Sequence, residues 1–212
     1  MDEAQVSVTL HYETGAAEFA ARLFGFAPAA VDLARLAGAL DGAAVQVSVR
    51  ADKGWLYLAV DDPAHFEVYE TSVRREADGK LFAYIHEVRV APGQGGGGLG
   101  LRAFVRQVTG AKALGLTCFR LWAAGSYFDT YHNGYYTWAR FGFDAELTVQ
   151  QKKQLTGAYS QATTVNEVIR QGGQAWWRRY GYDTAMWFDL SEQSGALKTF
   201  RQYAAEKGIS LE

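Results

Sequence analysis

Cysteine, proline and net charge are all scarce in this chain of 212 residues, which has one cysteine, three prolines and a formal charge of −2. The single Cys118 excludes a disulfide within the chain and any metal site built from several cysteines. No apolar run approaches the roughly 20 residues that a membrane helix needs, so no membrane partner is expected. The charge balance provides no global basic field for nucleic acid, although a local basic patch is compatible with it.

The residues that build a protein core are plentiful. Hydrophobic residues make up 49% of the chain and aromatic residues 14%, which is enough for a sizeable interior. The length favours a single domain over residues 1–212, with an elaboration. The N-terminal Met1-Asp2-Glu3 is acidic and lacks the basic and apolar regions of a signal peptide, which predicts a cytoplasmic protein.

Hydrophobic periodicity predicts a mixture of strands and helices. Alternating patterns predict strands over residues 6–12, 45–49, 55–60, 66–75, 81–90, 117–123, 143–147 and 184–190. Helical spacing and stop signals predict helices over residues 15–26, 28–40, 101–114, 134–140, 149–155, 164–171, 174–180 and 194–208. Asp78-Gly79 is the strongest hairpin signal. Thr164 and Glu167 have the spacing of a capping box, and Ser194 is expected to cap the last helix.

The most unusual stretch runs from Pro92 to Gly100, where all but three residues are glycine. It lies between the predicted strand 81–90 and the predicted helix 101–114. The first N–H groups of a helix have no partner inside it, and the helix dipole favours an anion there. Glycine allows successive N–H groups to face one concavity without a Cβ atom in the way. The arrangement therefore predicts a site for a phosphate-bearing ligand.

Two common phosphate loops do not fit this stretch. A mononucleotide loop ends in Gly-Lys-Ser/Thr, whereas this one ends in Leu99-Gly100-Leu101. The dinucleotide pattern is formally met by Gly95, Gly97 and Gly100, but no acidic residue follows in the window about 20 residues later. A plain flexible surface loop is a further alternative.

The strand and the loop together resemble the acyl-coenzyme A loop of the GNAT superfamily of N-acyltransferases. That loop reads Arg/Gln-x-x-Gly-x-Gly/Ala after a strand that ends Val-x-Pro, and this chain has Val90-Ala91-Pro92. Gly98 and Gly100 occupy the two small positions. Gly95 stands where the family has arginine or glutamine, and Gln94 comes one residue early.

A second similarity lies downstream. The segment from Trp138 to Phe143 is similar to the family's Tyr-x-Lys-x-Gly-Phe, in which a helix carries a tyrosine near the coenzyme sulfur. Trp138 replaces that tyrosine, and Arg140 stands at the usual lysine position. The resemblance covers roughly residues 81–147. The helices expected over residues 149–181 form an insert, and the helix over 194–208 follows it.

The resemblance implies one GNAT-like α+β domain, with a mixed, mainly antiparallel central sheet flanked by helices. The sheet is expected to open at the strand before the glycine loop. The implied reaction transfers an acetyl group from acetyl-CoA to a primary amine without a metal. Direct attack in a ternary complex is expected, because no placed cysteine argues for an acyl-enzyme. The implied coenzyme-binding residues are Val88, Arg89, Val90, Gln94, Gly95, Gly96, Gly97, Gly98, Leu99 and Gly100.

Two residues are candidates for proton transfer. Glu87 lies in the strand that meets the thioester, where resembling proteins often carry an acid, and is expected to deprotonate the amine. His86 is predicted to point to the opposite face from Glu87. Tyr135 lies one helical turn before Trp138 on the same face and is expected to supply a phenol to the leaving thiolate. The structural alternatives are a solvent-facing glutamate and a core tyrosine.

The sequence leaves the acceptor open. The candidates to line its pocket are Tyr127, Phe128 and Tyr131. The insert over residues 149–181 could act as a lid over the acceptor or as a partner surface. The amine could belong to a small molecule or a protein, and aminoacyl-tRNA is the one nucleic acid that stays open. A homodimer and a toxin or effector role are compatible with the sequence. The main alternative is a catalytically inactive GNAT-fold module that binds partners or senses coenzyme A, because the family's Arg/Gln and tyrosine are both missing.

Overall fold

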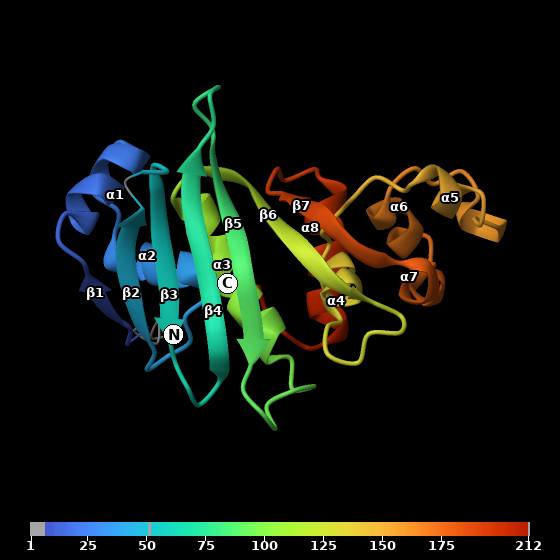
Figure 1. Ribbon diagram of the computed structural model, residues 1–212, viewed down its shortest axis with the longest axis horizontal. Coiled ribbons are helices and arrows are strands. Elements are labelled where there is room, and N and C mark those ends of the chain that lie inside the picture. Colours follow the sequence, from blue (N-terminus) through green and yellow to red (C-terminus); the bar gives the residue numbers. More distant parts are fainter. Residues whose placement is uncertain (1–6, 51, 212) are drawn as a thin grey trace. The chain divides into compact units, whose positions relative to one another are not determined.

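The computed structural model describes residues 7–50 and 52–211 and has the α+β character expected from the sequence (Figure 1). Among the strand pairs inside its N-terminal and C-terminal parts, one is parallel and four are antiparallel, in agreement with a mixed, mainly antiparallel sheet. The chain forms two compact units, the first running to Thr117 and the second from Cys118 to Ser210. None of the described helices is both long and apolar enough to cross a membrane.

The strands of the N-terminal unit each pair with the next in the chain, β1 with β2 in parallel and the others antiparallel. They are β1 (Thr9–Tyr12), β2 (Ala44–Arg50), β3 (Trp55–Asp61), β4 (Phe66–Arg75) and β5 (Leu81–Val90). Its helices are α1 (Ala16–Phe24), α2 (Ala30–Ala37) and α3 (Leu99–Ala113). The four strands predicted between the second helix and the glycine loop are therefore confirmed.

One face of this sheet is apolar and packs against the helices. Val45, Val47, Leu56 and Leu58 are fully buried, as alternation along half-buried strands requires. Helices α1 and α2 contact β2, β3 and β4, and α3 contacts β5; Figure 1 shows α2 and α3 behind the strands. Residues at the intervening positions, such as Tyr57, point to the opposite side of the sheet, which is called the open face below.

A buried glutamine joins α3 to the sheet. Gln107 is completely buried, and its amide nitrogen donates to the Leu36 carbonyl at 3.0 Å and to Thr71 Oγ1 at 2.9 Å. Its amide oxygen accepts a hydrogen bond from the Tyr69 hydroxyl at 2.9 Å. Every polar group of the side chain is therefore engaged, which is what makes its burial tolerable.

A glycine allows α2 and α3 to pack closely. A Cβ atom at Gly110 of α3 would lie 2.7 Å from the Asp32 carbonyl oxygen and closer still to the Leu36 amide nitrogen. Glycine in a helix interior costs about 1 kcal/mol relative to alanine. The close approach of the two helix backbones explains why this helix nevertheless contains one.

Gly110→Ala is expected to destabilise the protein by about 1–3 kcal/mol, because the backbones of α2 and α3 must move apart. Urea denaturation of parent and variant measures the difference. Gly100→Ala is the matched control, since Gly100 also lies in α3 but a Cβ atom there meets no atom within 4 Å. The control should be at least as stable as the parent. An equal loss in both variants would show that the contact with α2 is not the cause.

The C-terminal unit combines an antiparallel strand pair with several short helices. The pair is β6 (Leu116–Ser126) with β7 (Tyr182–Asp189). The helices are α4 (Gly134–Arg140), α5 (Val149–Lys152), α6 (Val165–Arg170), α7 (Gln174–Tyr180) and α8 (Gly195–Glu206), with a 3-10 turn at Gly157–Tyr159. Phe188 lies at the centre of the core, with its ring 5.3 Å from that of Phe143 and 5.8 Å from that of Phe200.

The predicted helix caps are confirmed. Thr164 Oγ1 accepts the Glu167 N–H, while the Glu167 carboxylate accepts the N–H groups of Thr163 and Thr164. These hydrogen bonds lower the pKa of Glu167. Ser194 caps α8 by accepting the Leu197 N–H at 3.0 Å. Such caps are local interactions, which is why the sequence pattern identifies them.

The strand predicted over residues 143–147 is wrong. This segment makes only isolated bridges, at Asp144 and Glu146. Asp144 forms one bridge to Trp187 of β7, but its carboxylate also accepts the N–H groups of Ala145 and Asn166, which turns the segment toward the start of α6 so that no ladder extends from the bridge. Burial raises the pKa of Asp144.

Two predicted helix ends also differ. Helix α1 ends at Gly25, with φ of 83°, so Phe26 lies beyond it and is 50% exposed. Helix α2 ends at Gly38, with φ of 81°, and not at Asp41-Gly42, so Leu40 lies outside it. In both cases an earlier glycine adopts the left-handed conformation that stops a helix. The predicted first strand is found from Thr9, and its start near Val6 lies outside the described residues.

Candidate functional site

The glycine run leads from the end of β5 into α3 (Figure 1). Gly98 precedes the helix with φ of 73°, so α3 begins at Leu99, two residues earlier than predicted. Leu99 and Gly100 therefore belong to the first helical turn and not to the loop. Gly93 and Gly96 also have positive φ, of 80° and 84°. These loop conformations are ones that other residues rarely adopt.

The Gln94 N–H bonds to the Ala91 carbonyl at 3.1 Å, whereas the later backbone amides of the loop have no partner among the described residues. Within the described part of the chain, no acceptor is bonded to the N–H groups of residues 95–101; the first such bond runs from Arg102 N–H to the Gly98 carbonyl, at 2.9 Å. No side chain caps the helix. Cβ atoms built at Gly95, Gly96 and Gly97 meet no atom within 4 Å, so the space beside these amides is open. Unpaired N–H groups at the positive end of a long helix suit an anion.

Apolar packing fixes the start of α3 on the sheet. Leu99 and Ala103 of α3 are buried in a cluster with Phe66 and Tyr69 of β4. Partly buried hydrophobic residues complete this cluster, among them Val88 and Val90 of β5 together with Leu40 and Val60. Both ends of the loop are therefore anchored, one by the last residues of β5 and the other by the first turn of α3. This anchoring holds the amides of the loop in a defined place.

Strand β5 carries a bulge close to the loop. Glu87 pairs with Glu70 of β4, and the register then shifts, which leaves His86 as an extra residue without a partner on β4. Glu70 and Ser72 share the open face because they lie two residues apart on β4. Glu87 lies opposite Glu70, and His86 bonds to Ser72, so both point to the open face. The prediction that they face opposite sides is wrong, because the bulge breaks the alternation.

Glu87 is exposed and forms an ion pair. Its carboxylate accepts a hydrogen bond from Arg89, whose guanidinium also lies 3.5 Å from the Glu67 carboxylate. Glu70, directly opposite Glu87, is exposed as well. Cross-strand partners have Cβ atoms about 5 Å apart, so Glu70 and Glu87 form a pair of carboxylates that suits a cationic amine. Sequence reasoning missed Glu70, because the register between β4 and β5 depends on the bulge.

His86 is held in the sheet by several contacts. Its Nε2 lies 2.9 Å from Ser72 Oγ, and its ring stacks on that of Tyr57 at 5.0 Å. Burial, followed by the charges of Arg74 and Lys53, lowers the pKa of His86. The lowered pKa favours the neutral imidazole, and the contacts of His86 are those of a packed side chain.

Tyr135 lies in the core of the C-terminal unit. The residue is 3% exposed, and its hydroxyl donates a hydrogen bond to the Arg178 carbonyl at 2.6 Å. Burial raises the pKa of the phenol. The Trp138 ring, at the position of the family's tyrosine, packs 5.1 Å from that of Phe143. A role for Tyr135 as proton donor would require its bond to Arg178 to break.

Tyr135→Phe is expected to lower stability by about 1 kcal/mol, because the Arg178 carbonyl loses its donor. Tyr136→Phe is the matched control, since none of the described residues forms a hydrogen bond with the Tyr136 hydroxyl. Thermal denaturation of the two variants compares them directly. A Tyr135→Phe protein with parental stability and no acyl transfer would instead identify this phenol as the proton donor.

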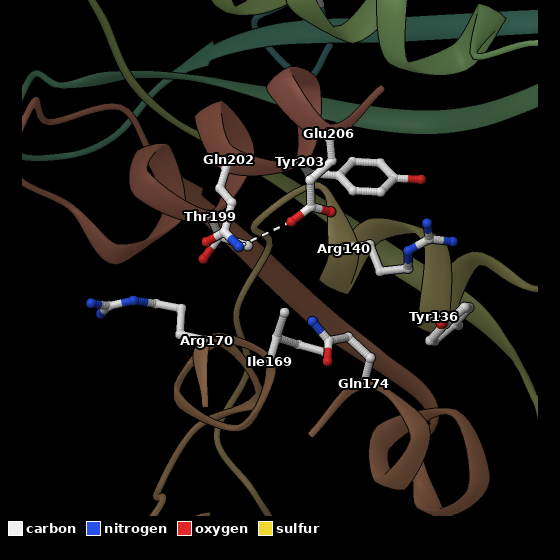
Figure 2. A pocket seen from close by; sticks show the side chains of 9 residues that line it. All are labelled: Tyr136, Arg140, Ile169, Arg170, Gln174, Thr199, Gln202, Tyr203 and Glu206. Carbon is white, nitrogen blue, oxygen red and sulfur yellow. Dashed lines mark hydrogen bonds between the residues drawn. The ribbon is translucent and has the colours of Figure 1, made fainter. Parts of the chain in front are cut away.

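A polar pocket of about 280 Å³ lies among helices of the C-terminal unit (Figure 2). Arg140 and Arg170 stand on opposite sides of it. The Arg140 guanidinium packs 4.5 Å from the ring centre of Tyr203 and 5.2 Å from that of Tyr136. These contacts hold Arg140 against tyrosine rings at the end of α4, where the family resemblance places a lysine. Charged and amide side chains line the pocket together with these two tyrosines.

A second pocket, of about 360 Å³, is lined by the loop after β6 and by residues of the predicted insert. Tyr127 and Phe128, two of the three aromatic candidates for an acceptor pocket, line it together with Tyr180 and Tyr182. Tyr131 is 93% exposed and is not part of the lining. The insert contributes glutamine side chains to this pocket, opposite the aromatic residues. Its role as a lid over the acceptor stays a prediction.

A metal site is not found among the described residues. Across residues 7–50 and 52–211, no group of three or more His, Cys, Asp and Glu side chains is arranged to hold a metal ion. Comparison with protein-family models, with curated proteins and with solved structures finds no match to this chain.

Proposed function

We propose that the protein is an acyl-CoA-dependent N-acyltransferase of GNAT type, which moves an acetyl group to a primary amine in the cytoplasm. The observation that supports this most is the row of unpaired N–H groups from the glycine loop into α3. Together with the positive end of the helix dipole, these donors suit the diphosphate of a coenzyme A thioester.

The residues of the loop fit such a ligand. The open space beside Gly95, Gly96 and Gly97 allows a diphosphate to approach the backbone. Gln94 in the loop and Arg102 in the first turns of α3 are exposed, so both side chains are available to phosphate groups. Acetyl-CoA would supply the acetyl group activated as a thioester.

The two carboxylates on the open face provide the acceptor side of the proposal. A lysine-type amine has a pKa of about 10.4 and is protonated at pH 7, so it must lose a proton before it can react. Glu70 and Glu87 attract the ammonium group, and Glu87 accepts its proton. The neutral nitrogen bonds to the acetyl carbon as the carbon–sulfur bond breaks. A backbone N–H between Val88 and Val90 donates to the carbonyl oxygen, and the second proton that the nitrogen loses passes through water to the leaving thiolate.

The alternative is a module that binds the coenzyme without turnover. The ion pair between Glu87 and Arg89 favours it, because a carboxylate that is already engaged is a weaker base. The bond from Tyr135 to the Arg178 carbonyl favours it too. Such a protein would sense coenzyme A or use the fold to bind a partner.

Thermal denaturation with and without acetyl-CoA tests the proposal. At a ligand concentration of about 100 times Kd, binding to the folded state adds about 2.7 kcal/mol, which should raise Tm by roughly 5–10 °C. Release of free thiol in the presence of a panel of small amines and peptides then measures turnover. No shift at millimolar acetyl-CoA would refute coenzyme binding. A shift without thiol release for any amine would favour the binding module.

A further inference from the structure

The open face of the N-terminal sheet carries a continuous cluster of rings, called here the aromatic platform. It consists of Trp55 and Tyr57 on β3 and Tyr84 and His86 on β5. The rings of Trp55 and Tyr57 have centroids 5.9 Å apart, and His86 lies 5.0 Å from both Tyr57 and Tyr84. Beneath them Ser72 of β4 is completely buried. The platform is therefore a packed surface and not a set of loose side chains.

Three cationic side chains lie on the aromatic platform. The Arg74 guanidinium is 3.2 Å from the ring centre of Trp55 and 5.0 Å from that of Tyr84. Lys53 Nζ lies 4.8 Å from the Trp55 ring, and the Arg50 guanidinium 5.6 Å from the Tyr57 ring. Cations over aromatic faces are held by the ring quadrupole. Positive charge is thus concentrated around Trp55, although the whole chain is slightly acidic.

The acidic residues of the same face mark where this surface ends. Glu70 and Glu87 lie beyond the row of Tyr57, Ser72 and Tyr84, on the side of the strands that leads to the glycine loop. Two acids lie near the Trp55 end, Asp52 in the turn between β2 and β3 and Glu76 two residues after Arg74, against three cationic side chains. A polyanion is therefore favoured at the Trp55 end of the platform and disfavoured at the Glu87 end.

We propose that the aromatic platform binds single-stranded nucleic acid. Such ligands combine a phosphate backbone, which pairs with arginine and lysine, with bases that stack on aromatic rings and on guanidinium planes. Arg50, Lys53 and Arg74 supply the charge, and Trp55 and Tyr57 supply ring surface beside it. An acidic peptide would match the charges but would leave the rings unused. The inference concerns a different surface from the glycine loop and does not depend on the proposed acyl transfer.

Fluorescence anisotropy with labelled oligonucleotides of about 12 uridines or thymidines, within the usual site sizes, tests this proposal on the full chain. Trp55→Ala should weaken binding by about fivefold to hundredfold, the range expected for loss of one stacked base. Lys53→Gln should reduce the slope of log K against log salt by about 0.7, the value for one phosphate contact with a single strand. Lys198→Gln, an exposed lysine of α8, is the matched control and should bind as the parent does.

Three results would overturn the proposal. The first is no binding of either oligonucleotide at low salt. The second is parental affinity and parental salt slope in both the Trp55 and the Lys53 variants. The third is equal binding of a labelled oligoglutamate, which would identify the surface as a site for an acidic protein segment. Lys53 is exposed in a turn, so its variant keeps the test valid even if Trp55→Ala fails to fold.

Discussion

Gly97→Glu is expected to lower the affinity for acetyl-CoA by at least about 100-fold. Gly97 is exposed in the middle of the glycine loop, has no positive φ, and would place a Cβ atom in open space. A glutamate can therefore enter without backbone strain. One negative charge about 5 Å from a bound diphosphate costs about 3 kcal/mol at an effective dielectric constant of about 20, which is more than 100-fold in Kd.

Gly97→Lys is the matched control, because it adds a side chain of similar length at the same position with the opposite charge. It should bind acetyl-CoA at least as tightly as the parent. Titration calorimetry at low and high salt completes the test, since screening should reduce the penalty of the glutamate. If both variants lose affinity equally, the cause is steric. If neither changes it, the diphosphate is not bound at this loop.

The glycine loop could be predicted from sequence because each of its determinants is local. Alternation defined β5 to the residue, from Leu81 to Val90. The stripe of apolar residues after the loop defined α3, and its start shifted only because Gly98 already adopts the conformation that precedes a helix. The same holds for the capping box at Thr164 and Glu167. Interactions between residues three or four apart leave a readable pattern.

The rest of the candidate site depends on contacts between distant residues. Glu70 became a candidate only through its pairing with Glu87, which follows from an extra residue in β5 that alternation does not reveal. The partner of the Tyr135 hydroxyl lies 43 residues away, in α7. The aromatic platform likewise joins β3 with β5 across β4, with Arg74 between them. These arrangements are set by strand register and helix packing, and a single sequence specifies them only indirectly.

The same bulge links the strand to the proposed chemistry. With strict alternation, only one of His86 and Glu87 would reach the open face. The extra residue instead places both there, with His86 bound to Ser72 and Glu87 beside Glu70. Bulges are frequent next to active sites because they redirect a side chain without ending the strand. The bulge therefore places the Glu87 carboxylate beside that of Glu70 on the open face.

Glu87→Gln is expected to reduce kcat/KM for acetyl transfer by about 100-fold or more, the usual contribution of a general base. The amide has the same shape as the carboxylate but cannot accept a proton. Affinity for acetyl-CoA should stay unchanged, because the side chain precedes the loop and points to the open face. The defect should shrink as the pH approaches the amine pKa of about 10.4, where the acceptor deprotonates without help. Initial rates between pH 7 and 10 measure this recovery.

Glu67→Gln is the matched control for this prediction. Glu67 also lies next to the Arg89 guanidinium, at 3.5 Å, so its replacement removes a carboxylate from the same ion-pair cluster. Its loss should change the rate by less than about fivefold, as expected for an exposed ion pair worth about 1 kcal/mol or less. A similar loss in both variants would mean that the cluster around Arg89 matters as a whole. Parental rates at all pH values in the Glu87 variant would assign the base to another residue, with Glu70 opposite it as the next to replace.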